Sequence, residues 1–288
     1  MSDIRPAWSA PFLDGGPGPA PYVAWPGRVT RRWAYGDGRA AGVKVAIVDS
    51  GVDAEHPAVA GVARAVDVAA DRAGAITIVE GPHEDRYGHG TACAGLIRRV
   101  APGAELISVR VLGADLRGNA DCLAAAIDWC IEAGVDVVNL SLSSSNERYR
   151  GTFWELVDRA AFAHVCLVSA MSNERKVTIP SELAGVFSVA CGSGHDLEAV
   201  WCNPRGPAEW AAPGIDLEVA WSGGRTMVTS GNSIAAAVVS GHVARVVGAH
   251  PGVAPWQVRA VLAAVARNAP ITATYPSRPP ARSSSGRR

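Results

Sequence analysis

Three residues of types that act together in acyl transfer stand far apart in the chain. Ser233 lies in Thr229–Gly241, TSGNSIAAAVVSG, where a Ser/Gly turn leads into a helix of small and β-branched residues. In the first turn of a helix, backbone N–H groups without intrahelical partners face whatever approaches the side chain. A serine hydroxyl is unreactive at neutral pH, so a nucleophilic Ser233 needs a base and a third group that holds the base.

Two upstream residues are candidates for these partners. Asp49 ends VKVAIVDSG, a run typical of a buried parallel strand that breaks at a Ser-Gly turn. A carboxylate at the carboxyl end of such a strand lies where the sites of α/β proteins usually form. His89 stands between two glycines at the start of a helix-like run, RYGHGTACAGLI. The sequence therefore predicts a base at a helix N-terminus beside a carboxylate at a strand end.

The segments VAIVDSGVDAEHP, GHGTACAG and SGNSIAAAVVSG, in the order Asp, His, Ser, resemble the signature blocks of the subtilisin family of serine proteases. Taken alone, a serine at a helix start is usually a cap and an aspartate after a strand a turn former. The three blocks together indicate the family over about residues 43–267. The resemblance implies a subtilisin-like three-layer α/β fold, with a mostly parallel central sheet flanked by helices, and a catalytic triad of Asp49, His89 and Ser233.

The resemblance also assigns residues that bind the reacting peptide. Asn173, in MSNERK, stands where the family has an Ala-Gly-Asn-Glu block, so its side-chain amide is expected to donate to the oxyanion, with the Ser233 backbone N–H as second donor. The segment Ser141, Leu142, Ser143 is expected to pair with the substrate backbone as an added strand.

Three positions bear on the primary specificity pocket. Ser143 and Ser172 stand where subtilisins commonly have glycine, on opposite walls, and should make the pocket narrower and more polar. Glu174 at the rim favours Lys or Arg substrates instead. These two indications disagree. We expect a small or polar residue before the scissile bond in preference to Lys or Arg.

The nucleophile block departs from the family pattern Gly-Thr-Ser-Met-Ala-x-Pro at two positions. Asn232 replaces a threonine whose hydroxyl can help the oxyanion hole, a role that an amide can also fill. Ala237 replaces a proline that shapes the helix. These changes leave two alternatives to hydrolysis open: a ligase or macrocyclase in which an amine intercepts the acyl-enzyme, and a catalytically decayed peptide-binding pseudoprotease. Cys93, one turn after His89, is expected to be a small buried residue under the site.

Hydrophobic patterns predict the elements that position these residues. Strands are expected at 43–49, 63–68, 76–79, about 104–112, 135–143, 164–170, 186–190, 208–211 and 217–220, and helices at 90–99, 119–133, 152–163, 233–248 and 255–267. The sequence thus divides into an extended N-terminal arm at 1–38, the peptidase domain at 39–269, and a disordered tail rich in Arg, Pro and Ser at 270–288. Family members usually carry a folding prodomain; the arm leaves no room for one, so we expect the sequence either to start at the mature end or to fold without it.

Bulk properties narrow the function classes. The net charge of zero gives no reason to expect nucleic acid or a membrane surface as partner, so the expected partner is a peptide or protein substrate. Without a signal segment or membrane span, and with six scattered cysteines expected as free thiols, we expect a cytoplasmic protein. No cofactor or metal is expected, because a family calcium loop between Val100 and Ala101 is missing. We therefore expect an intracellular serine endopeptidase that processes precursor or leader peptides, in an oligomeric state that the sequence leaves open.

Overall fold

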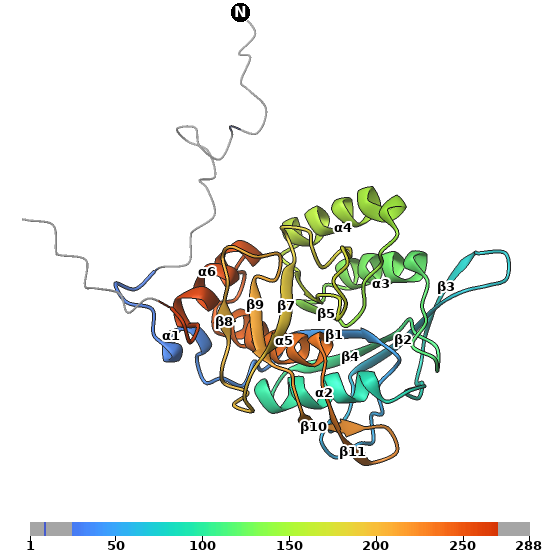
Figure 1. Cartoon of the computed structure of the whole chain (residues 1–288), viewed down its shortest axis with the longest axis horizontal. Coiled ribbons are helices and arrows are strands. Elements are labelled where there is room, and N and C mark those ends of the chain that lie inside the picture. Colours follow the sequence, from blue (N-terminus) through green and yellow to red (C-terminus); the bar gives the residue numbers. More distant parts are fainter. Residues whose placement is uncertain (1–8, 10–24, 270–288) are drawn as a thin grey trace, which may run out of the picture.

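A nine-stranded sheet forms the centre of the computed structural model, which describes residues 9 and 25–269 (Figure 1). The strand order is β3-β2-β4-β1-β5-β6-β7-β9-β8, and only the edge strands β3 and β8 run antiparallel to their neighbours. The strands are β1 Lys44–Asp49, β2 Arg64–Ala70, β3 Ile76–Glu80, β4 Glu105–Arg110, β5 Val137–Leu140, β6 Cys166–Ala170, β7 Phe187–Gly192, β8 Trp201–Cys202 and β9 Trp210–Pro213. The predicted tail at 270–288 and residues 1–8 and 10–24 of the predicted arm lie outside the described residues.

Helices cover both faces of the sheet. Along β1, Val45 and Ile47 belong to a core shared with α2 and α5, whereas Ala46 and Val48 belong to a second core shared with α3 and α4. Figure 1 shows α3 and α4 on one side of the sheet and α2 on the other. The helices are α1 Arg31–Tyr35, α2 His89–Val100, α3 Ala120–Glu132, α4 Arg150–Phe162, α5 Asn232–Ala249 and α6 Pro255–Val265, with a 3-10 turn at Glu147–Tyr149. The predicted three-layer α/β fold, with a mostly parallel sheet, is confirmed.

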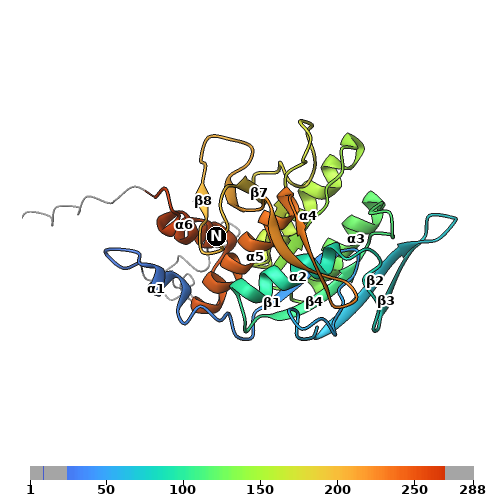
Figure 2. The ribbon, with the colours of Figure 1, turned by 60° about the horizontal axis from the view of Figure 1, so that its bottom comes forward.

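The helix α5, which begins at the nucleophile block, is buried along most of its length because small side chains let other elements approach it. A Cβ atom at Gly241 would lie 2.6 Å from Cβ of Val100, the last residue of α2. Figure 2 shows the two helices side by side. This close contact fixes the helix that carries Ser233 against the helix that carries His89.

The strand predicted at 217–220 lies outside the central sheet. Residues 217–220 do form a strand, β10 Leu217–Trp221, but it pairs antiparallel with β11 Arg225–Thr229 as a separate two-stranded sheet. The inner face of β10, Leu217 and Val219, packs in the core that contains α2. Neither β11, which is largely exposed, nor the two-residue β8 shows a hydrophobic pattern that predicts it. The hairpin therefore covers α2 and leads the chain directly to Ser233.

The described part of the arm is not extended throughout, because α1 interrupts it. Thr30 caps this helix by accepting a hydrogen bond from the Trp33 N–H at 3.2 Å, a pattern that favours a helix start. Arg31 pairs with Glu198 at 2.6 Å, and the buried side chains of Ala34 and Tyr35 hold α1 against the core shared with α5. None of the described helices is long and apolar enough to cross a membrane.

Candidate active site

The structure brings Asp49, His89 and Ser233 into one hydrogen-bonded chain. His89 Nδ1 lies 2.8 and 3.0 Å from the two carboxylate oxygens of Asp49, and His89 Nε2 lies 2.8 Å from Ser233 Oγ. The partners assign the tautomer: Nδ1–H donates to the carboxylate, and Nε2 accepts from the hydroxyl. Each residue stands at an element end, namely the end of β1, the start of α2 and the first turn of α5. This arrangement can activate a serine nucleophile.

Electrostatics favour the protonated form of His89 beside Asp49. Burial acts to lower the pKa of His89, but the charge of Asp49 and the hydrogen bond to it raise that pKa well above its usual value. Burial acts to raise the pKa of Asp49. The charge of His89, the hydrogen bond to it and the Ser50 N–H nevertheless hold the pKa of Asp49 below its usual value. The pair therefore stabilises the imidazolium that forms when His89 takes a proton from Ser233.

Asp85, which the sequence analysis did not single out, holds the loop before His89. One of its carboxylate oxygens accepts hydrogen bonds from the Ser50 hydroxyl at 2.7 Å, the Gly88 N–H at 2.8 Å and the Tyr87 N–H at 3.0 Å. The other accepts from the N–H and hydroxyl of Thr91 at 2.9 and 2.6 Å. Asp85 thus joins the turn after Asp49 to the start of α2. The signal in the sequence was an aspartate just ahead of a glycine-flanked helix start, which is typical of capping.

Cys93 lies beneath the triad and is buried. Its sulfur is 3.3 Å from Ser141 Oγ, 3.8 Å from an Asp49 oxygen and 3.9 Å from His89 Nδ1. Burial raises the pKa of this thiol, so it stays protonated and is a poor nucleophile. Asp49, His89 and Cys93 also place ligand-type atoms within 4.8 Å of one another, but the triad hydrogen bonds already use the Asp49 and His89 atoms.

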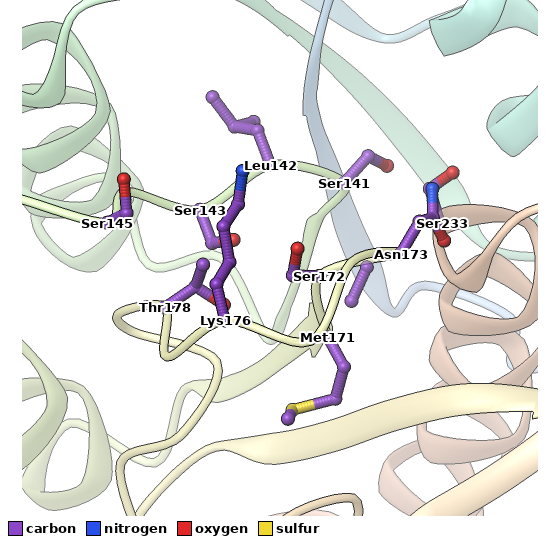
Figure 3. A pocket seen from close by; sticks show the side chains of 11 residues that line it. Ser141, Leu142, Ser143, Ser145, Met171, Ser172, Asn173, Lys176, Thr178 and Ser233 are labelled. Atoms are coloured by element: carbon purple, nitrogen blue, oxygen red, sulfur yellow. The ribbon is translucent and has the colours of Figure 1, made fainter.

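Asn173 presents its side-chain nitrogen beside Ser233. Its Oδ1 accepts a hydrogen bond from the Asn232 N–H at 3.0 Å, and within the described residues its Nδ2 donates to no protein atom. A Cβ atom at Gly231 would lie 3.3 Å from Ser233 Oγ and 3.9 Å from Asn173 Nδ2, so both atoms border a space that this glycine leaves open. Figure 3 shows the two side chains next to each other at one end of the cavity. The geometry provides an amide donor where negative charge develops on a carbonyl oxygen.

Asn232 does not face this space, which corrects the suggestion that its amide donates to the oxyanion. Its Nδ2 donates to the backbone oxygens of Met171 and Ser172 at 3.2 and 3.1 Å, and its Oδ1 accepts from the Cys191 N–H at 2.8 Å. These three hydrogen bonds connect the start of α5 to β7 and to the segment after β6. The other departure, Ala237, is fully buried within a continuous helix.

A polar cavity of ≈ 250 Å³ extends from Ser233 between β5 and the segment after β6 (Figure 3). Its lining is Ser141, Leu142, Ser143, Ser145, Ala170, Met171, Ser172, Asn173, Lys176, Thr178 and Ser233. Four of the five residues predicted to bind substrate therefore border it. The fifth, Glu174, does not line the cavity and pairs with Lys176 at 2.9 Å, with 78% of its side chain exposed.

Comparisons with known proteins agree with this geometry. The model of the subtilase family matches residues 40–278. The chain belongs to the subtilase family. Over 229 residues it is 30% identical to a thermostable alkaline protease of Halalkalibacterium halodurans, a match that covers 76% of this chain and 60% of that protein. It is also 30% identical to subtilisin BL of Lederbergia lenta, over 76% of this chain and 81% of that protein.

A solved structure shares the fold of this subtilase. It is described as a cold adapted subtilisin-like serine proteinase, with a TM-score of 0.62 and 23% identity over 78% of this chain and 82% of that one. A third relative, subtilisin E of Bacillus subtilis, is 28% identical over 75% of the subtilase and 58% of its own length. The subtilase thus spans about 60% of the length of two of these curated relatives.

Lys176 is a second residue of the site that the sequence analysis missed. It stands three positions after Asn173 and lines the cavity that Glu174 was expected to border. Which of the consecutive charged residues Glu174, Arg175 and Lys176 faces inward depends on the course of the loop. The order of residues alone does not reveal that course in a segment without regular structure.

Proposed function

We propose that this subtilase is a serine endopeptidase that cleaves peptide bonds through an acyl-enzyme on Ser233. The observation that carries the proposal is the hydrogen-bonded chain from Asp49 through His89 to Ser233, with the free amide of Asn173 beside the hydroxyl. The relatives named as proteases support the same reaction class.

The reaction follows from these positions. His89 Nε2 takes the hydroxyl proton as Ser233 Oγ attacks the peptide carbonyl, and Asp49 stabilises the imidazolium. Asn173 Nδ2 and the Ser233 backbone N–H bind the oxyanion. His89 then gives its proton to the departing amine as the C–N bond breaks. A water molecule repeats the sequence at the ester: it loses a proton to His89, attacks the carbonyl, and releases the acid and the Ser233 hydroxyl.

Substrate backbone binding is supported by free main-chain groups beside the triad. The strand β5 ends at Leu140, and in the described structure Leu142 and Ser143 form no backbone hydrogen bond. The chain pairs again at Ser144, which exchanges two hydrogen bonds with Ile179 at 2.7 and 2.9 Å. An extended peptide can use the open positions as an added strand, which gives affinity with little demand on sequence.

The cavity provides selectivity among substrates, because its small volume and its many hydroxyl groups suit only a few kinds of substrate side chain. This supports the narrower part of the proposal, in which the protein processes a small number of precursor or leader peptides. Digestion of casein at many unrelated sites would contradict this narrower role.

The test is intact-mass analysis after treatment with a fluorophosphonate. The wild type should gain one adduct, and Ser233→Ala should gain none. Ser230→Ala is the matched control, because Ser230 lies in the same turn but among the described residues its hydroxyl bonds only to the exposed Asp216. This variant should label as the wild type does. An unlabelled, folded wild type would overturn the proposal. Peptide cleavage with and without an added amine then separates hydrolysis from ligation.

A further inference from the structure

Side chains that can donate hydrogen bonds predominate in the lining of the cavity beside Ser233. Its lining includes the hydroxyl-bearing residues Ser141, Ser143, Ser145, Ser172 and Thr178 together with Lys176, and no acidic residue of the described part of the chain. In Figure 3 the Lys176 side chain runs past Ser143 toward the segment of Leu142, with its nitrogen at the far end. A positive charge therefore borders a space otherwise lined by neutral groups, most of them hydroxyl-bearing side chains and the rest the side chains of Leu142, Ala170, Met171 and Asn173.

Three of these hydroxyl groups remain able to donate a hydrogen bond. In the described part of the chain Ser143 Oγ and Ser145 Oγ form none, and Ser172 Oγ only accepts one, from the Glu174 N–H at 3.2 Å. Thr178 differs, because its hydroxyl is bound to Ser181 at 2.7 Å. Ser141 Oγ accepts a hydrogen bond from Asn139 Nδ2 at 2.9 Å and lies 3.3 Å from the sulfur of Cys93, so it faces the triad as well as the cavity. Ser143, Ser145 and Ser172 therefore bring free donors to the cavity that Lys176 also lines.

The only described partner of the Lys176 ammonium is Glu174, at 2.9 Å. The two side chains are 50% and 78% exposed, and ion pairs this open to water are weak because the solvent competes for both charges. A carboxylate inside the cavity would face more donors and less water than Glu174 does. Lys176 can therefore exchange its exposed partner for an anionic group of a substrate.

We propose that the cavity receives the side chain before the scissile bond and that Lys176 selects substrates with Asp or Glu at that position. This inference rests on the proposed endopeptidase function and adds its substrate class. A substrate carboxylate forms a charge-assisted hydrogen bond with Lys176 and accepts further bonds from the serine hydroxyls. A basic side chain meets like charge, and an apolar one leaves these donors without acceptors. The expected preference for Glu over its neutral isostere Gln is about 10–100-fold in kcat/KM.

The test compares peptides that differ only in the residue before the scissile bond: Asp, Glu, Asn, Gln, Ala, Lys and Phe. The wild type should cleave the Glu or Asp peptide at least about tenfold faster than its amide counterpart. Lys176→Met should remove this ratio while the Ala and Gln peptides are still cleaved, and Lys176→Glu should move the preference toward Lys. Added salt should lower the wild-type Glu-to-Gln ratio, since it screens a partly exposed charge.

Arg175→Met is the matched control. Arg175 is the adjacent exposed cation, but it does not line the cavity, so its loss should leave the ratios unchanged. Equal cleavage of the Glu and Gln peptides by the wild type, or an unchanged ratio in Lys176→Met, overturns the inference. Fluorophosphonate labelling of every variant separates the two proposals. A labelled protein without acid preference contradicts only the substrate class, and an unlabelled wild type contradicts the peptidase function itself.

Discussion

Replacing Asn232 by alanine should both destabilise the protein and slow its reaction. The side chain forms three hydrogen bonds, to the Cys191 N–H and to the backbone oxygens of Met171 and Ser172. At about 0.5–1.5 kcal/mol each, their loss costs about 2–4 kcal/mol. For a domain of this size we expect Tm to fall by roughly 5–15 °C. Because Met171 and Ser172 lead directly to Asn173, kcat should fall more than KM changes, by up to about 100-fold.

The isosteric Asn232→Asp variant sharpens the test. It keeps an acceptor for the Cys191 N–H but turns a carboxylate oxygen toward two carbonyl oxygens, so at pH 7 it should be less stable than Asn232→Ala. Thermal unfolding is measured in a Ser233→Ala background, which prevents self-digestion. Asn268→Ala is the control: it loses two hydrogen bonds to Cys202 and should lower Tm without changing kcat. A Tm of Asn232→Ala within about 2 °C of the wild type would refute the reasoning.

Three further predictions test the site and its support. Asn173→Ala should lower kcat by about 100–1000-fold with little change in KM. If Asn173 made only a structural contact, its loss would lower Tm and leave kcat unchanged. The raised pKa of His89 predicts that kcat/KM, which needs the neutral imidazole, falls as pH drops through a midpoint above 6.5. In Asp49→Asn the charge that raises the pKa of His89 is removed while burial still lowers that pKa, so the midpoint of kcat/KM should move to lower pH. An unchanged midpoint would mean that a group other than His89 titrates there. Gly241→Val should overpack Val100 and destabilise by about 1–3 kcal/mol in denaturant unfolding, and an unchanged midpoint would contradict the close helix contact.

The central elements were predictable because their signals are local. The strand ending at Asp49 is a run of apolar residues long enough only for a strand, and its burial on both faces follows from its place inside a parallel sheet. The bounds of the five predicted helices agree with the structure to within about two residues, and the clearest local signals are the Asn119 cap before α3 and Gly134 just after its end. Failures fall where such signals are weak: β8 has two residues, and β11 has no buried face.

The sequence by itself determined which chemistry the site can perform. Asp49, His89, Ser233 and Asn173 carry the groups that the proposed reaction uses, and each lies in a short block that also specifies its strand end, loop or helix start. These blocks place the four residues because a strand end or a helix N-terminus has one local geometry. Their meeting at hydrogen-bond distance then follows from the fold that the same blocks indicate.

Only the tertiary structure decided how the site is supported and what its cavity presents. Asp85 and Asn232 form hydrogen bonds with segments that are distant in the chain. Lys176 borders a cavity that several segments enclose. Glu174 and Lys176 are two positions apart, and the sequence favoured the acidic one at the cavity. The physical reason is that a loop has no fixed period, so the direction of its side chains is set by packing against other elements rather than by their order.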